Sequence, residues 1–262
     1  MSTPHWALAL VTGASSGIGD HLARQLAAAG SDLIVVARSA DKLRALADEL
    51  DDAHGVTVEV LPADLADAAG VHAVEQRLAT GPAVDLLVNN AGVGTSGDFA
   101  TLDLVAEISQ IALNITALVR LTHAVLPAMI ERGSGAVLNV SSLGSLQPLP
   151  GYATYGATKA FVTSFGEALH EELRGTGVSL TTVLPGFTRT EFQARAGVQA
   201  EGALPGLLWG RADVVASEAL AATARGRALV IPGNLNKAAS ALTKPLPRGV
   251  KRRLVGAIGK RF

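Results

Sequence analysis

The chain has 262 residues, 48% hydrophobic and 17% charged, which is enough apolar material for a substantial core and excludes a disordered chain. It contains no cysteine, which excludes disulfides, thiolate metal sites, iron–sulfur clusters and cysteine nucleophiles together. The net charge of −1 hides an asymmetry: residues 1–218 hold 12 Lys and Arg against 23 Asp and Glu, whereas residues 219–262 hold the other 10 basic residues and no acidic one.

Neither a membrane helix nor a leader is expected. No apolar run reaches the ~18 to 20 residues that a membrane helix needs. The N-terminal residues 1–6 lack a basic region and do not have the pattern of a signal peptide. We therefore expect a soluble protein of the cytoplasm, and the absence of cysteine fits a reducing compartment.

Seven apolar runs of strand length alternate with helical patterns along the chain. The expected strands span residues 7–11, 33–36, 56–61, 85–88, 136–140, 178–184 and 228–231. The expected helices span residues 17–29, 40–50, 67–79, about 101–131, and 153–174. Strands without a polar face that alternate with helices indicate a parallel sheet covered on both sides. Because no linker interrupts residues 1–262, the sequence predicts one doubly wound α/β domain.

The first expected strand runs into a glycine-rich turn, Thr12-Gly13-Ala14-Ser15-Ser16-Gly17-Ile18-Gly19. Glycines permit positive φ and let backbone N–H groups approach a diphosphate, and the following helix points its positive end at the phosphates. The spacing is Gly-x-x-x-Gly-x-Gly rather than the commoner G-x-G-x-x-G. A nucleotide site is the sharper hypothesis, and a plain tight turn is the alternative.

Polar residues follow the next three strands. Arg38 stands after the second strand, where an NAD site usually has a carboxylate, so it favours NADP over NAD by offering a partner for a 2′-phosphate. A solvated arginine at a helix start is the alternative. Asp64 follows the third strand, and Asn89-Asn90-Ala91-Gly92 follows the fourth. Taken alone these are ordinary loop residues at the edge where open α/β sheets place ligands.

Tyr155 and Lys159 lie at i and i+4 near the start of an expected helix, and so share a face. A cation beside a tyrosine stabilises the phenolate and lowers its pKa, which makes a general acid or base. A surface pair is the alternative. Ser142 ends the fifth strand, where its hydroxyl could bond a substrate oxygen. Asn114 is an amide inside an apolar helix and needs a partner, which in most proteins is structural.

The combination is more specific than its parts. In chain order it comprises Thr12-Gly13-x-x-x-Gly17-x-Gly19, Asn89-Asn90-Ala91-Gly92, Ser142, Tyr155-x-x-x-Lys159 and Pro185-Gly186. It resembles the compact branch of the short-chain dehydrogenase/reductase family, from about residue 6 to about 232. The resemblance implies a single Rossmann domain with a seven-stranded parallel sheet, in which hydride passes between nicotinamide C4 and a carbonyl or alcohol carbon.

The resemblance also implies roles for individual residues. Tyr155 matches the catalytic acid/base, Lys159 lowers its pKa and bonds the nicotinamide ribose, Ser142 steadies the substrate oxygen, and Asn114 holds a proton-relay water. The implied cofactor contacts are Gly13, Ser15, Ser16, Gly17, Ile18 and Gly19 in the turn, Arg38 at the 2′-phosphate, Asp64 and Leu65 at the adenine, Asn90, Ala91 and Gly92 at the adenosine ribose or backbone, and Pro185, Gly186, Thr188 and Thr190 at the carboxamide. Thr188 replaces a usual aliphatic residue.

Two further segments bear on partners. A lid is expected over about 187–212, and its apolar side chains, including Phe187, Phe192 and Trp209, indicate an apolar ketone or ketoacyl substrate; packing of the lid on the body is the alternative. The basic tail over about 244–262 has an amphipathic pattern that suits an anionic membrane surface, an acyl carrier or coenzyme A phosphates. Packing on the acidic body or on a second subunit is the alternative.

The leading hypothesis is an NADPH-dependent reductase of an apolar ketone or ketoacyl compound. An alcohol dehydrogenase working in the oxidative direction, a cofactor-sensing protein on the same fold and a peripheral membrane protein acting through its tail are the alternatives. The family implies a homo-dimer or homo-tetramer. No nucleic-acid partner is expected, and no metal, since the six histidines have no ligand spacing.

Overall fold

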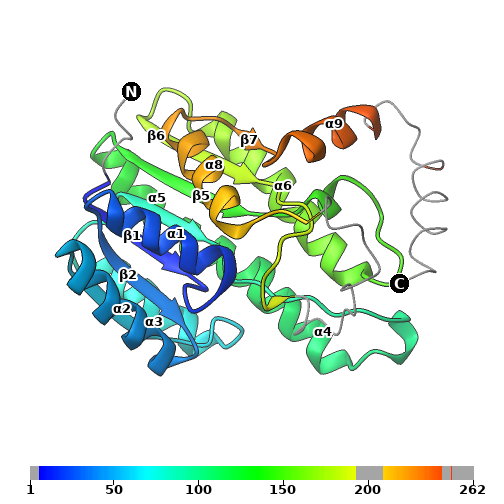
Figure 1. The fold of residues 1–262 in the computed structure, drawn as a ribbon, viewed down its shortest axis with the longest axis horizontal. Coiled ribbons are helices and arrows are strands. Elements are labelled where there is room, and N and C mark those ends of the chain that lie inside the picture. The colour runs from blue at the N-terminus through cyan, green and yellow to red at the C-terminus, as the bar shows by residue number, and fades with distance from the viewer. Residues whose placement is uncertain (1–5, 193–208, 244–248, 250–262) are drawn as a thin grey trace.

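A seven-stranded parallel sheet runs through the protein and has helices on both faces (Figure 1). The computed structural model describes residues 6–192, 209–243 and 249. In chain order the strands are β1 (Leu8–Thr12), β2 (Asp32–Ala37), β3 (Val58–Pro62), β4 (Leu86–Asn89), β5 (Gly135–Val140), β6 (Val178–Val183) and β7 (Leu229–Val230). Their order in the sheet is β3-β2-β1-β4-β5-β6-β7, so the winding reverses between β1 and β4. The predicted doubly wound α/β fold and all seven strands are confirmed.

The helices form two layers. They are α1 (Gly17–Ala28), α2 (Ala40–His54), α3 (Ala68–Thr80), α4 (Leu104–Ile111), α5 (Leu118–Glu131), α6 (Ala153–Glu172), α8 (Ala212–Ala224) and α9 (Asn234–Thr243), with short turns η1 (Phe99–Thr101), η2 (Ala112–Ala117) and η3 (Leu143–Leu146). Helices α1, α2 and α8 cover one face of the sheet, and α3, α5 and α6 cover the other. Figure 1 shows α4 and α9 beyond the ends toward which the arrowheads of β5 and β6 point.

The core is divided by the sheet because successive strand side chains point to opposite faces. In β1, Ala9 and Val11 join the apolar cluster that contains Leu22 of α1, whereas Leu10 joins the cluster that contains Leu121 of α5. All the strands except β3 and β7 are buried along nearly their whole length, as expected of parallel strands covered on both faces.

The helix expected over about 101–131 differs from the structure in two respects. It begins at Leu104, because the Asp103 side chain accepts a hydrogen bond from the Val105 N–H at 3.1 Å and so caps the helix there. It is also interrupted at residues 112–117 by a π-helical segment, η2, which contains Asn114. Such segments occur most often at functional sites. Helices α8 and α9 were not anticipated.

The run Leu104–Glu131 corrects the expectation that no apolar run is long enough to span a membrane. By length and composition it is long and apolar enough. In the protein its α5 portion places Leu121, Val125 and Met129 in the core against the sheet. A core helix of a soluble protein passes the same test of length and composition.

Two of the predicted segments are only partly described. Of the expected lid over 187–212, residues 193–208 lie outside the described residues. The expected basic tail over 244–262 also lies outside them, apart from Gly249.

The hydroxyl of Thr12 joins β1 to the end of β4 at the point where the winding reverses. It donates to the Val88 carbonyl at 3.0 Å and accepts from the backbone N–H groups of Asn90 and Ala91, each at 3.0 Å. Thr12 is fully buried. One side chain therefore holds the first turn of the Asn90–Gly92 loop against the start of the glycine turn.

Replacing Thr12 with valine is expected to lower the free energy of unfolding by about 2 kcal/mol, because the Ala91 N–H loses its acceptor and the Asn90 N–H keeps only the Val88 carbonyl. Thr223→Val is the matched control, since Thr223 is equally buried but its hydroxyl only donates to Ala219 O within α8. The control should lose less than about 1 kcal/mol. Urea unfolding at one protein concentration, with unchanged slope, measures both; equal losses would contradict the special role of Thr12.

Candidate active site

The glycine turn is shaped so that no larger residue fits at its centre. Gly13 and Gly17 have φ of +67° and +59°, a region that favours glycine. A Cβ on Gly19 would stand 2.3 Å from the Gly13 carbonyl oxygen and 2.4 Å from Nδ2 of Asn90. Ser15 and Ser16 lie in the turn, and Ile18 is the second residue of α1. The turn therefore places the backbone next to the positive end of α1, as an anion-binding cradle requires.

The side chain of Asn90 supports this turn from below. Its Nδ2 donates to the carbonyls of Thr12 at 2.8 Å and Gly13 at 3.2 Å. The amide of Asn90 therefore shapes the glycine turn, and the contact expected between Asn90 and a cofactor stays a prediction.

Arg38 and Asp64 meet across the tips of β2 and β3. Arg38 Nη1 lies 3.9 Å from Asp64 Oδ2, and their side chains are 66% and 47% exposed. A pair this open is weak, so the guanidinium keeps most of its capacity for another anion. The Asp64 carboxylate also accepts from the Ala66 N–H at 3.0 Å. Leu65, by contrast, is buried in the core, so its side chain does not reach this edge.

The segment after β6 returns to the glycine turn. Thr188 is buried, its hydroxyl donates to the Gly186 carbonyl at 3.0 Å, and it forms a β-bridge with Gly210. A Cβ on Gly17 would stand 3.0 Å from Cγ2 of Thr190. The structure thus brings the two expected cofactor segments, residues 13–19 and 185–190, into contact.

Ser142, Tyr155 and Lys159 converge at the end of β5. Ser142 accepts from the Gly144 N–H at 3.0 Å and is hydrogen-bonded with the phenol of Tyr155. Lys159, one helical turn beyond Tyr155 on α6, is buried, and its Nζ donates to the Val140 carbonyl at 2.9 Å. The Nζ atom lies 6.0 Å from the centre of the Tyr155 ring.

Asn114 completes the group from η2. Its Oδ1 accepts from the Val93 N–H at 3.0 Å, and its Nδ2 donates to the Val93 carbonyl at 2.9 Å and to Oγ1 of Thr158 at 3.0 Å. The Asn114 side-chain amide, for which the apolar helix offers no partner, is therefore hydrogen-bonded to the loop after β4 and to α6. A Cβ on Gly92 would stand 3.3 Å from Asn114 Oδ1 and 3.2 Å from Lys159 Nζ, so Gly92 lies between them.

The electrostatics of this group correct one expectation. Burial raises the pKa of the Tyr155 phenol above its ordinary 10.0, and the hydrogen bond with Ser142 offsets this only in part. Burial also lowers the pKa of Lys159 to about 8. Desolvation is the largest effect on the pKa of Tyr155 here, and the lowering by Lys159 that the resemblance implies stays a prediction. Tyr155 is therefore a neutral phenol near pH 7, which is a proton donor rather than a base.

Apolar and aromatic groups surround the phenol. The Phe192 ring is tilted at 48° to the Tyr155 ring, with 5.4 Å between centroids. Phe187 and Trp209, from the two described ends of the expected lid, have centroids 6.0 Å apart. Of these three rings, Phe192 lies against Tyr155, so the side of the phenol that it covers is suited to an apolar group.

Sequence reasoning missed several residues of this region. Tyr152 is hydrogen-bonded with Ser96, and the Gly97 N–H donates to the Gly151 carbonyl at 2.9 Å, so the loops after β4 and β5 are joined. Asn236 of α9 lies behind Gly186, where a Cβ would come within 2.7 Å of its amide. No local sequence pattern predicts these contacts, because each joins segments that are far apart in the chain.

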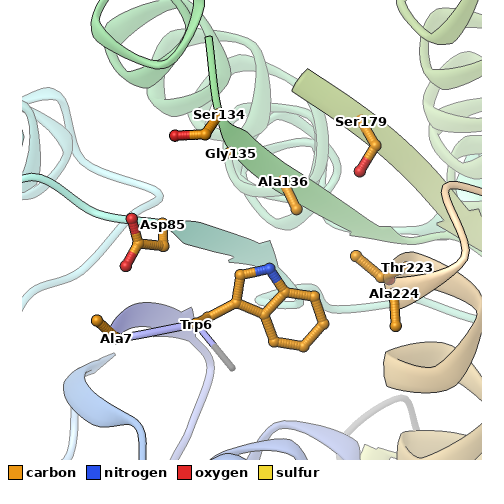
Figure 2. A pocket seen from close by; sticks show the side chains of 9 residues that line it. All are labelled: Trp6, Ala7, Asp85, Ser134, Gly135, Ala136, Ser179, Thr223 and Ala224. Carbon is orange, nitrogen blue, oxygen red and sulfur yellow. The ribbon is translucent and has the colours of Figure 1, made fainter. Parts of the chain in front are cut away.

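A separate hollow of about 350 Å³ lies at the opposite edge of the sheet (Figure 2). It is lined by Trp6, Ala7, Asp85, Ser134, Gly135, Ala136, Ser179, Thr223 and Ala224. The Asp85 carboxylate is already engaged, since Oδ2 accepts from the Leu8 N–H at 3.1 Å. No expected site residue lines this hollow. Within residues 6–192 and 209–243, no three His, Asp or Glu side chains are grouped to hold a metal.

Comparisons with known proteins agree with this geometry. A family model described as short chain dehydrogenase matches residues 7–200. Sulfoacetaldehyde reductase 2 of Chromohalobacter salexigens is 43% identical over 188 residues, 71% of this chain and 74% of that protein. The human very-long-chain 3-oxoacyl-CoA reductase is 37% identical over 188 residues, 70% of this chain and only 60% of that longer protein.

A solved structure gives the same picture. The short-chain dehydrogenase from Sphingobium yanoikuyae, in complex with NADPH, superposes with a TM-score of 0.82 and 38% sequence identity. The match covers 92% of this chain and 96% of that chain.

The buried position of Lys159 predicts an unusual titration. Of the six lysines in the chain, one should titrate at about 8 rather than 10.5 in an NMR experiment, and its signal should be missing from Lys159→Met. At pH below about 8 the buried charge disfavours the folded state, and this penalty fades as the pH rises toward 10.5. The free energy of unfolding should therefore rise, relative to Lys159→Met, by on the order of 3 kcal/mol across that window. Six lysines that all titrate near 10.5 would contradict this.

Proposed function

This chain belongs to the short-chain dehydrogenase family and is an oxidoreductase, and we propose that it is an NADP(H)-dependent reductase of an apolar ketone or ketoacyl compound. The observation that carries the proposal is the convergence of Ser142, a protonated Tyr155 and Lys159 at the carboxyl edge of the sheet. That edge is where doubly wound folds bind their ligands.

The proposed mechanism follows from these side chains. The hydroxyls of Ser142 and Tyr155 are hydrogen-bonded and can hold one carbonyl oxygen between them. As negative charge develops on that oxygen, Tyr155 transfers its proton to it, and Ser142 stabilises the charge by donating a hydrogen bond. When bound, a nicotinamide cofactor would supply the hydride to the carbonyl carbon. Lys159 is the cation that stabilises the phenolate left behind, provided its own proton is retained.

The cofactor proposal fits the cradle at Gly19, where any Cβ would fill the space beside the Gly13 carbonyl. Residues 13–19 would hold the diphosphate, and the exposed guanidinium of Arg38 would pair with a 2′-phosphate. A neighbouring structure at 38% identity was solved with NADPH, which supports the preference for NADP over NAD.

The raised pKa of Tyr155 also bears on the direction of the reaction. Reduction needs protonated Tyr155, which persists at neutral pH because its pKa lies above 10.0. Oxidation of an alcohol needs the phenolate, whose population rises only as the pH approaches that value. At neutral pH the proposed site is therefore better suited to reduction than to oxidation, although one catalyst accelerates both directions.

The substrate class is argued from the walls of the site. Phe192 packs at a tilt against Tyr155, and Phe187 and Trp209 pair at the two described ends of the expected lid. A relative is named for reduction of a 3-oxoacyl-CoA, a ketone on a long apolar chain. Another is named for sulfoacetaldehyde, a small anion, which such walls do not suit. NADPH oxidation should therefore be faster with aryl ketones and 3-ketoacyl thioesters than with sulfoacetaldehyde; the reverse order would exclude the apolar class.

Self-association is proposed through an apolar face on α4. Leu104, Val105 and Ile108 form a helical stripe and are 66%, 75% and 57% exposed. A monomer rarely exposes large side chains side by side. Light scattering should give at least twice the mass of one chain, and a mass of 26.7 kDa would exclude this.

Tyr155→Phe is expected to lower turnover by roughly 10²- to 10⁴-fold, the usual contribution of a general acid, while NADPH binding is almost unchanged. Tyr152→Phe is the matched control, because Tyr152 is the only other tyrosine and its loss should cost less than about tenfold. Steady-state rates and fluorescence titration of NADPH measure the two effects. Substantial turnover by Tyr155→Phe would remove Tyr155 from the acid role.

Arg38→Asp is expected to weaken NADPH binding by roughly tenfold to a hundredfold and to leave NADH binding within a few-fold, because only NADPH carries the 2′-phosphate. Arg44→Asp is the control, since Arg44 is equally exposed on α2 but pairs with Asp41. Dissociation constants for both cofactors decide the question. If Arg38→Asp raises the dissociation constants of NADPH and NADH by the same factor, Arg38 does not bind the 2′-phosphate.

A further inference from the structure

The loop after β4, residues 93–97, forms one wall against the Tyr155 ring. A Cβ on Gly94 would stand 3.2 Å from Cδ2 of Tyr155 and 2.8 Å from Cζ of Phe192. The backbone at Gly94 therefore lies against both rings, and any side chain added there would push on them. The position of this loop decides how closely Tyr155 is enclosed.

The two neighbours of Gly94 are both held by side chains from the same helix. Val93 is bonded through its N–H and carbonyl to Asn114. The N–H of Thr95 donates to Oε1 of Gln110 at 2.9 Å, and the Thr95 hydroxyl donates to Oε1 of Glu107 at 2.5 Å. Residues 107, 110 and 114 are spaced by three and four, so they share one face of α4 and η2.

Glu107 and Gln110 are costly residues to bury. They are 3% and 0% exposed, and among the described residues Oε2 of Glu107 and Nε2 of Gln110 have no hydrogen-bond partner. A buried polar pair that is only half satisfied is generally less stable than an apolar pair of the same size. Stability alone therefore does not account for Glu107 and Gln110. The hydrogen bonds that their side chains make all go to Thr95.

We propose that Glu107 and Gln110 are positioning residues of the active site, which hold Thr95 and thereby press the Gly94 backbone against the ring of Tyr155. They touch neither the phenol oxygen nor any group expected to react. Their effect is to fix the width of the substrate site on this side and to keep water from the ring. The catalytic consequence rests on the proposed reductase function, but the enclosure of Tyr155 does not.

The test uses the fact that the chain has only two tyrosines. In a Tyr152→Phe background, tyrosinate absorbance reports Tyr155 alone, without cofactor or substrate. Because this change also removes the bond between Tyr152 and Ser96 of the same loop, Tyr152→Phe is the parent with which every variant is compared. Gln110→Met frees the Thr95 N–H, and the double variant Thr95→Val with Glu107→Leu removes both partners of the hydroxyl bond without leaving a further buried group unpaired. In either variant the midpoint of Tyr155 should fall toward 10.0, because the loop no longer shields the ring.

Two controls separate positioning from general damage. Thr95→Ser keeps the hydroxyl and should restore the parent midpoint. Thr101→Val removes a hydroxyl bond to the Asp98 carbonyl on the exposed η1 turn and should change nothing. Because the double variant leaves no additional buried group unpaired, it serves as the test if Gln110→Met does not fold.

Kinetics give the second readout. With the best ketone substrate, both variants should lose about tenfold or more in kcat, the cost of a misplaced catalytic group, while the Kd for NADPH is unchanged. Folded variants with the parent midpoint and parent kcat would overturn the proposal. If no carbonyl compound is reduced by the parent protein, the proposed function fails, and the midpoint alone still decides whether Glu107 and Gln110 enclose Tyr155.

Discussion

The reversal of strand order between β1 and β4 is the constraint on which the site depends. At that point the connections after β1 and β4 lead to opposite faces of the sheet, so a crevice is left open between them at the carboxyl edge. The two diverging loops must be held together without filling this crevice. Thr12 does this with one buried hydroxyl, and Asn90 does it from the other strand with one amide. Because both are bonded to backbone, the glycine turn has a defined shape before any ligand arrives.

The same edge shows how burial and chemistry are connected. Enclosure raises the pKa of Tyr155 and lowers that of Lys159, so both groups move toward their neutral forms. A neutral phenol is the acid that carbonyl reduction needs, whereas a lysine near its own pKa stabilises a phenolate only while it keeps its proton. The loop at Gly94 and the ring of Phe192 lie against Tyr155 and contribute to its enclosure. The reactivity of the site is therefore set by packing as much as by the identity of the four polar residues.

Prediction from the sequence succeeded where a signal is local. The alternation of apolar strands and helices predicts the doubly wound sheet. The spacing of the glycines from Gly13 to Gly19 predicts a tight turn, and in the structure Gly13 and Gly17 have the positive φ of such a turn. It failed at boundaries and at α8, where small residues are buried on several faces and leave no clear helical stripe. The long helix was expected to be regular, but the π-helical segment around Asn114 has no signature in an apolar run.

What the sequence determined by itself is therefore the fold class and the set of chemical groups, because strand and helix periodicity and short motifs depend only on neighbours along the chain. Only the tertiary structure decided how those groups behave. The direction of the Tyr155 pKa depends on desolvation by Phe192 and Gly94, which are 37 and 61 positions away in the chain. The roles of Glu107 and Gln110 depend in the same way on Thr95, which contacts them only once the loop after β4 folds over α4.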